Sequence, residues 1–128
     1  MAVKFGVTTK KDPRNPGAEP KYYAIVKSSG RDDLDAVAQK TAEISTASPG
    51  DTALVLENFI SVLPKELAEG KIVELGGFGT FRLSVSSDGA ATADDVTARS
   101  INDVRVIFSP GKRFQQILDA IVFQKEAN

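Results

Sequence analysis

Gly76, Gly77 and Gly79 form a closely spaced cluster, and glycine clusters of this kind can cradle phosphate groups with their backbone amides. The cluster lacks the G-x-G-x-x-G spacing of dinucleotide-binding turns, and the sequence contains no G-x-x-x-x-G-K-[ST] motif. It also does not open a helical pattern. The spacing therefore favours a tight turn between two strands over a nucleotide-binding loop.

Two pairs of adjacent carboxylates are the other candidates for chemistry. Asp32 and Asp33 precede an amphipathic pattern and are interpreted as helix caps, whereas Asp94 and Asp95 lie in a polar segment with no accompanying motif. The chain has no histidine and no cysteine, so Ser-His and Cys-His catalysts, disulfides and thiolate zinc sites are excluded. Chemistry by carboxylates alone remains open, but we expect no enzymatic activity, no cofactor and no metal.

The charge is divided unevenly along the chain. The net charge is −1, but residues 1–31 contain seven basic and two acidic residues, so this segment carries +5 and the remaining 97 residues carry −6. A charge split of this kind predicts an interaction surface on the basic segment. Lysines that are merely solvated on exposed strands are the alternative.

The composition is that of a soluble globular chain, with 41% hydrophobic and 26% charged residues. No apolar stretch is long enough to span a membrane, and none follows Met1 as a signal peptide requires. We expect a cytoplasmic protein with no membrane partner and no small-molecule substrate.

The elements that position these residues begin with two strands. Residues 3–9 and 21–27 alternate apolar and polar side chains or are rich in strand-forming residues, and a proline-broken loop joins them. We interpret residues 1–30 as an N-terminal β-hairpin extension. Tyr22 and Tyr23 point to opposite faces of a strand, so one of them is expected in the core.

Two helices and a strand-rich segment follow. The first helix is expected from Asp32 or Asp33 to near Ser45, and the second is capped by Ser48 and ends at Gly70. Pro64 should kink its last turns. The remaining elements are strands at 72–75, 80–85 and 104–108, a polar arm at 86–100, and a final helix whose apolar face is Phe114, Ile117, Leu118 and Ile121, with Val122 and Phe123 close behind.

The order helix, helix, GKIVELGGFGTFRL (residues 70–83), arm, VRVIFSPGKRFQQIL (residues 104–118) resembles the HU/IHF family of bacterial histone-like DNA-binding proteins over residues 31–123. Nearly the whole chain is similar to a longer HU-related group of Bacteroidetes type. The residues that carry this second resemblance are Asn15-Pro16, the KYYA segment of residues 21–24 and the SSGR segment of residues 28–31.

The resemblance implies an α+β, HU/IHF-like fold: two N-terminal helices, a three-stranded antiparallel sheet with an arm, and a C-terminal helix, here residues 31–128, preceded by the additional β-hairpin. Phe78 and Phe81 would pack in a dimer core beside Phe59 and Phe108. Gly77 and Gly79 would let backbone amides approach phosphate, and Lys112 would lie near a helix N-terminus that favours an anion.

The arm departs from the family pattern. An HU arm carries a proline that wedges between base steps, but no proline lies between Phe81 and Phe108. Residues 84–103 contain four aspartates (Asp88, Asp94, Asp95 and Asp103) and one basic residue, Arg99. Because contact with phosphate supplies most nonspecific affinity for DNA, this arm is expected to clasp a duplex weakly or not at all.

The function expected from these patterns is sequence-tolerant binding of double-stranded DNA by a homodimer, through phosphate contacts, in a nucleoid or architectural role. The candidate contact residues are Arg82, Arg105, Lys112, Arg113, Gly77, Gly79, Lys4, Lys10, Lys11, Lys21 and Lys27. The alternative is a dimeric protein-interaction module on an HU scaffold that has lost DNA binding. The acidic arm and the pI near 5.5 favour that alternative.

Overall fold

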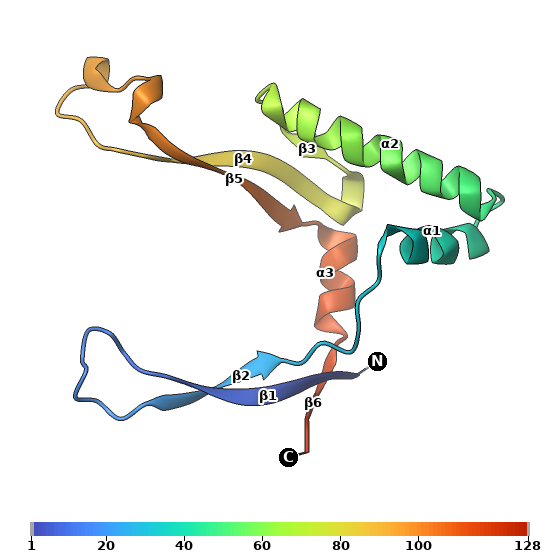
Figure 1. Cartoon of the computed structure of the whole chain (residues 1–128), viewed down its shortest axis with the longest axis horizontal. Coiled ribbons are helices and arrows are strands. Elements are labelled where there is room, and N and C mark those ends of the chain that lie inside the picture. The colour runs from blue at the N-terminus through green and yellow to red at the C-terminus, as the bar shows by residue number, and fades with distance from the viewer. Residues whose placement is uncertain (1, 128) are drawn as a thin grey trace. The chain divides into compact units, whose positions relative to one another are not determined.

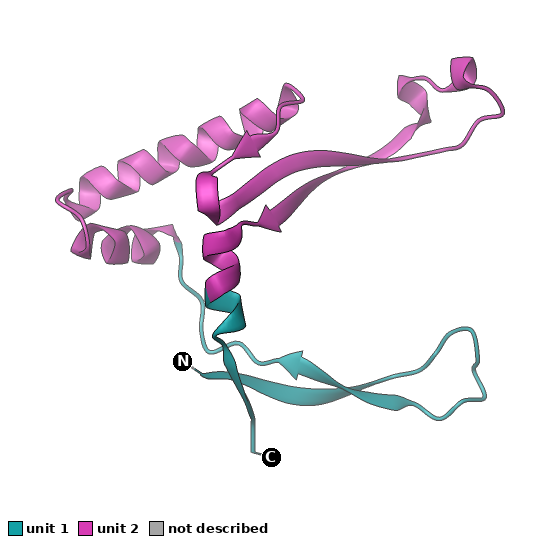
Figure 2. Cartoon of the chain, turned by 180° about the vertical axis from the view of Figure 1, so that it is seen from behind, with its two compact units in different colours: residues 1–33, 117–128 teal, residues 34–116 magenta. Residues whose placement is uncertain are grey.

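The structure, a computed structural model, describes residues 2–127 (Figure 1). The elements are, in order, β1 (Ala2–Lys10), β2 (Lys21–Val26), α1 (Leu34–Glu43), α2 (Pro49–Ala68), β3 (Val73–Glu74), the 3-10 turn η1 (Gly76–Phe78), β4 (Gly79–Ser87), the 3-10 turns η2 (Ala93–Asp95) and η3 (Ala98–Ser100), β5 (Ile101–Pro110), α3 (Lys112–Asp119) and β6 (Val122–Lys125). The chain divides into two compact units (Figure 2). Unit 1 contains the residues up to Asp33 and those from Ile117 onward, and unit 2 is Leu34–Gln116.

Unit 1 is built on a three-stranded sheet in the order β2-β1-β6. β1 pairs with β2 in antiparallel fashion, with Lys10 opposite Lys21, and pairs with β6 in parallel, with Ala2 opposite Val122. The sheet therefore joins the beginning of the described chain to its end.

The prediction that one apolar helix face continues through Ile121, with Val122 and Phe123 close behind, is wrong. α3 ends at Asp119, where the Ala120 N–H donates to the Ile117 carbonyl at 3.2 Å and closes the last turn. Val122 and Phe123 then extend into β6 because β1 offers an unpaired edge to this β-branched and aromatic pair. A pairing partner so distant in the sequence leaves no trace in local periodicity.

In unit 2, the predicted start of the second helix is confirmed. The Ser48 side chain accepts a hydrogen bond from the Asp51 N–H at 3.0 Å, and Pro49 occupies the first helical position. α2 continues through Pro64 to Ala68. Gly70, at φ +84°, donates its N–H to the Leu67 carbonyl at 2.9 Å and closes the helix.

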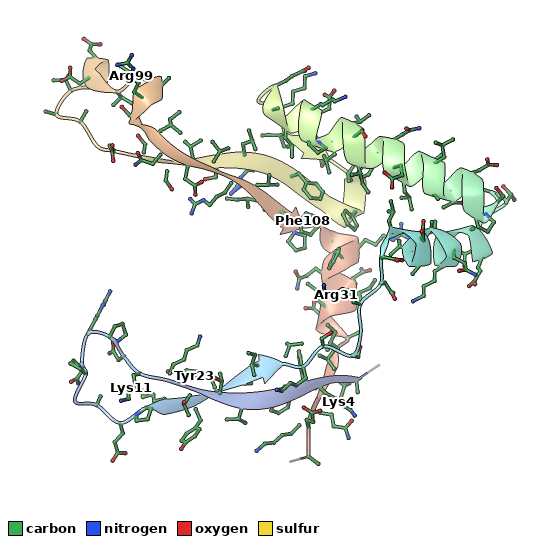
Figure 3. All side chains as sticks on the ribbon, viewed as in Figure 1. Lys4, Lys11, Tyr23, Arg31, Arg99 and Phe108 are labelled. Atoms are coloured by element: carbon green, nitrogen blue, oxygen red, sulfur yellow. The ribbon has the colours of Figure 1, made fainter. Side chains whose placement is uncertain are left out.

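The second sheet has the order β3-β4-β5, and β4 and β5 form its long antiparallel ribbon. The segment expected to be a polar arm contains η2 and η3. At the arm, the Asp88 N–H donates to the Ser100 carbonyl at 2.9 Å, and the Asn102 side-chain amide donates to the Asp88 carboxylate at 2.9 Å. The arm is therefore a hydrogen-bonded structure, with Arg99 at its tip and Phe108 at the base of the ribbon (Figure 3).

Four phenylalanine rings form the main aromatic cluster of unit 2. Phe108 lies 4.8 Å from Phe81, 5.3 Å from Phe78 and 5.6 Å from Phe114, measured between ring centroids. Phe59 has no ring contact with this cluster in the described residues and is 39% exposed on α2. The resemblance placed Phe59 beside these rings in a dimer core, and within the single chain it lies apart from them.

Few large side chains are buried within the described residues. The buried hydrophobic residues are Ala38, Ala42 and Leu67, whereas Leu54 and Val55 on α2 are 61% and 65% exposed. A chain of this composition would normally enclose more of its apolar surface than this. The apolar side chains of α2 and the apolar face of the β4–β5 ribbon therefore form an incomplete core.

Candidate nucleic-acid interface

The register of β4 and β5 brings Arg82 and Arg105 to the same face of the ribbon. Arg82 lies opposite Ile107 and Arg105 lies opposite Ser84, and residues directly opposite one another in an antiparallel pair share a face. The two arginines are therefore diagonal neighbours, with backbones roughly 7–8 Å apart. The strand residues that share this face, here called the arginine face, are Thr80, Arg82, Ser84, Ser86, Asp103, Arg105, Ile107 and Ser109.

The other face of the ribbon is apolar and turns toward α2. A groove of about 430 Å³ lies between them, lined by Leu63, Pro64, Leu67 and Ala68 of the helix and by Phe81, Leu83, Val104 and Val106 of the ribbon. Because α2 lies over the apolar side, the arginine face is left open to solvent. Both Arg82 and Arg105 are exposed.

The glycine cluster packs η1 against the junction between β5 and α3. The Gly111 N–H donates to the Phe78 carbonyl at 2.9 Å, and a Cβ at Gly111 would overlap the backbone carbonyl of Gly77. At Gly79, where φ is +147°, a Cβ would lie 2.5 Å from the Phe108 ring and from the Ser109 oxygen. Close backbone packing thus accounts for these glycines, as the expected tight turn requires. Gly79 is buried and Gly77 is exposed.

Lys112 and Arg113 begin α3 directly beside this turn. The Gly111 carbonyl accepts the first helical hydrogen bond from the Gln115 N–H at 2.9 Å, and both basic side chains are exposed. Arg113 covers Gly77, whose Cβ would lie 3.0 Å from the Arg113 Cβ. The N-terminus of a helix attracts anions through its free amides and its dipole, so two exposed cations here add to an anion-favouring position.

The remaining basic candidates lie in unit 1. Lys4, Lys10 and Lys21 are on β1 and β2, and Lys27 directly follows β2, where its N–H donates to the Lys4 carbonyl at 2.8 Å. Lys11 lies in the loop beyond β1 (Figure 3). All five of these lysines are exposed.

The prediction that one of the two adjacent tyrosines belongs to a core is wrong for this chain. Tyr22 is 74% exposed and Tyr23 is 45% exposed, because no other element covers either side chain at this end of the sheet. The Lys10 ammonium lies 5.8 Å from the centre of the Tyr23 ring, a cation–π contact that was not predicted. The contact joins Lys10 of β1 to Tyr23 of β2, so it depends on the strand register and has no local signal in the sequence.

The described residues contain no group of three or more acidic side chains placed to hold a metal ion. In the same part of the chain, no helix is both long and apolar enough to cross a bilayer.

A family model for an HU domain fused to wHTH, Ig or glycine-rich motifs matches residues 1–125. The chain belongs to this family. The resemblance to HU-related proteins is thereby confirmed, and the mixed α+β structure with two small sheets is consistent with an HU-like fold. None of the curated proteins matches the HU-family chain.

A solved structure from Bacteroides vulgatus, described as a "Putative bacterial DNA binding protein", is similar to this HU-family chain. The TM-score is 0.66 with 14% sequence identity, and the match covers 97% of this chain. It covers 47% of the other protein, so the chain spans about half the length of that structure. At this identity, the likeness concerns the fold.

Proposed function

We propose that this chain binds double-stranded DNA without sequence preference, through contacts with phosphate, and serves an architectural role in the nucleoid. The observation that carries the proposal is the arginine face, on which the register gathers Arg82 and Arg105 away from α2. Arginine is well suited to phosphate because its guanidinium donates several hydrogen bonds in a planar fork. The HU domain of the family and the name of the solved neighbour support the same ligand.

The proposed contacts belong to an HU-like domain of residues 31–128 and to an N-terminal β-hairpin extension of residues 1–30. In the domain they are Arg82, Arg105, Lys112, Arg113 and the backbone amides of Gly77 and Gly79; in the extension they are Lys4, Lys10, Lys11, Lys21 and Lys27. The proposed role of these side chains and amides is donation to phosphate oxygens, and contacts with phosphate carry no sequence information.

The DNA-binding form in this proposal is a homodimer. Leu54, Val55 and Ile60 leave α2 with exposed fractions of 61%, 65% and 49%, and the groove beside the helix is lined by apolar side chains. Exposed apolar surface of this extent marks a site of association, and identical chains most often associate through a two-fold axis. A second copy would complete the core that one chain leaves open.

A second candidate function is a dimeric protein-interaction module that does not bind DNA. The composition of the arm favours this function. Residues 84–103 contain one basic residue, Arg99, and four acidic residues, Asp88, Asp94, Asp95 and Asp103. Four carboxylates repel a phosphate backbone, and they would instead suit a basic protein partner.

Titration of a labelled duplex of mixed sequence at 50 and 200 mM salt separates the two functions. We expect affinity to fall steeply with salt, and the Arg82→Gln/Arg105→Gln variant to reduce the slope of log affinity against log salt by about 1.8 per chain, at 0.9 per lost phosphate contact. Arg99→Gln, which removes an arginine outside the arginine face, is the matched control. Absence of binding at low salt would favour the protein-interaction module.

A further inference from the structure

The strand register of unit 1 gathers four lysines on one face of its sheet. Lys10 lies opposite Lys21, and Lys4, six residues before Lys10, shares its face because successive strand residues alternate. Lys27 continues β2 on the same face, and its side chain lies over Gly6, where a Cβ would be 2.6 Å from the Lys27 Cε. These four residues, here called the lysine face, come from segments separated by the loop of residues 11–20.

The ammonium groups of the lysine face are free to meet an external anion. All four lysines are exposed, and within residues 2–127 none forms an ion pair with a carboxylate. Lys71 in unit 2 provides the contrast: hydrogen bonds to Glu69 and Glu66, at 3.0 and 3.1 Å, raise the pKa of Lys71 and neutralise its charge locally. The strand residues of β1, β2 and β6 include no carboxylate.

The opposite face of the same sheet has a different chemistry. Phe5 lies opposite Val26 and Val3 lies beside Phe123, so these side chains share the face that the lysines do not occupy. Val26 and Phe123 are 62% and 58% exposed. The two faces of the sheet therefore differ: four lysines share one face with Ile25, whereas the opposite face carries the single lysine Lys125 among mainly apolar side chains. The concentration of positive charge makes the lysine face the better surface for a polyanion.

We infer that the lysine face binds the phosphate backbone of double-stranded DNA as a second surface, independent of the arginine face of unit 2. The inference rests on the proposed function in that DNA is the ligand. Lys10 follows Lys4 by six residue steps along β1, a span of about 20 Å, which corresponds to roughly six base pairs along a duplex axis. Lysine ammonium groups on flexible stems act as point charges, so this surface reads phosphate without reading bases.

Tyr23 lies within the lysine face and adds a non-ionic contact. Its ring is 45% exposed and lies under the Lys10 ammonium at 5.8 Å from the ring centre. The cation–π contact holds the Lys10 side chain over the sheet, which reduces the conformational entropy that this lysine would lose on meeting a phosphate.

The test is the salt dependence of duplex binding by the full chain carrying Lys4→Gln, Lys10→Gln, Lys21→Gln and Lys27→Gln together. We expect the slope of log affinity against log salt to fall by about 3.6 per chain, which corresponds to a roughly 100-fold smaller loss of affinity between 50 and 200 mM salt. The corresponding variant with four arginines keeps the charge and should retain binding. Lys125→Gln removes a lysine of the same sheet on the opposite face and should change the slope little.

The outcomes separate this inference from the proposed function. An unchanged slope in the four-glutamine variant, together with a reduced slope in Arg82→Gln/Arg105→Gln, would overturn the inference and leave DNA binding through the arginine face intact. A reduced slope in the four-glutamine variant, with an unchanged slope in Arg82→Gln/Arg105→Gln, would support DNA contact by the lysine face and contradict DNA contact by the arginine face. An effect of Lys125→Gln equal to one quarter of the four-lysine effect would indicate total charge instead of a face. Lysine-dependent binding to vesicles containing anionic lipid, with no duplex binding, would also overturn the inference.

Discussion

The two hairpin-like ribbons of this chain, β1–β2 and β4–β5, share a strand geometry and differ in almost everything that DNA would contact. Residues 2–27 contain six basic and two acidic residues, whereas residues 79–110 contain three basic and four acidic residues. The β4–β5 ribbon has α2 over its apolar face, and the β1–β2 ribbon leaves its apolar face open. Antiparallel pairing provides the same backbone frame in both ribbons, and the placement of charged side chains decides which ribbon suits a polyanion.

The ends of the two ribbons differ as well. The β4–β5 arm has no proline and is closed by η2 and η3. The loop between β1 and β2 contains Pro16 in a turn in which the Ala18 N–H donates to the Asn15 carbonyl at 3.0 Å. In this chain, the proline-containing tip therefore belongs to the basic ribbon.

The largest effect should come from the aromatic cluster at the base of β4–β5. Phe108→Ala removes a ring that contacts three others, and we expect it to lower the free energy of unfolding by about 3 kcal/mol, at the low end for buried phenylalanine because Phe108 is only partly buried. Phe123→Ala in unit 1 should cost less than about 1 kcal/mol, since that ring is 58% exposed. Urea unfolding at one protein concentration measures the free energy of unfolding of both variants. Equal decreases would contradict the expectation that the Phe108 ring stabilises the fold more than the Phe123 ring does.

A smaller loss of stability is expected at the glycine that starts β4. Gly79→Ala places a Cβ against the Phe108 ring and the Ser109 oxygen at an unfavourable φ of +147°, and we expect a cost of about 2 kcal/mol. Gly89→Ala in the arm is the control, because no atom lies within 4 Å of its Cβ position. A melting temperature for Gly79→Ala equal to that of the control would show that the turn adapts freely.

Removal of negative charge from the arm should increase the affinity for a duplex. Asp94→Asn/Asp103→Asn removes two carboxylates, and we expect duplex affinity at low salt to rise by about threefold, since repulsion of phosphate is relieved. The measurement is the duplex titration at 50 mM salt. Unaltered affinity would place the arm beyond a Debye length from bound DNA.

The smallest effect is expected at the tip of the basic ribbon. Pro16→Ala keeps every lysine, and its main consequence is a slightly more flexible turn in the unfolded chain, so duplex affinity should change by less than about twofold. Fluorescence titration measures the affinity. A loss of duplex affinity as large as that of the four-lysine variant would indicate that DNA contacts the loop tip and not the lysine face.

Local signals in the sequence predicted the local features well. The Ser48 cap, the Pro49 start and the end of α2 before Gly70 each depend on residues a few positions apart, and the structure confirms them. The tight turn at the glycine cluster was predicted for the same reason. Such features are settled by backbone chemistry within one or two turns of chain.

Features that depend on distant partners were not predictable in this way. Lys4 and Lys10 share a face because successive residues of a strand alternate between its two faces. Whether Lys21 and Lys27 lie on that same face depends on the β1–β2 register, which the loop of residues 11–20 does not specify by itself. The strand at Val122–Lys125 depends on β1, and the exposure of Tyr22 and Tyr23 depends on what covers the sheet.

The parallel pairing of β6 with β1 also bears on biosynthesis. During translation, β1 and β2 leave the ribosome before unit 2, and all of unit 2 must follow before Val122 becomes available to pair with Ala2. Until then the outer edge of β1 presents unpaired amides and carbonyls, which can template pairing with another nascent chain. Contacts so distant in the sequence also form slowly. We therefore expect unit 1 to mature after unit 2 and to depend more than unit 2 on protection from self-association.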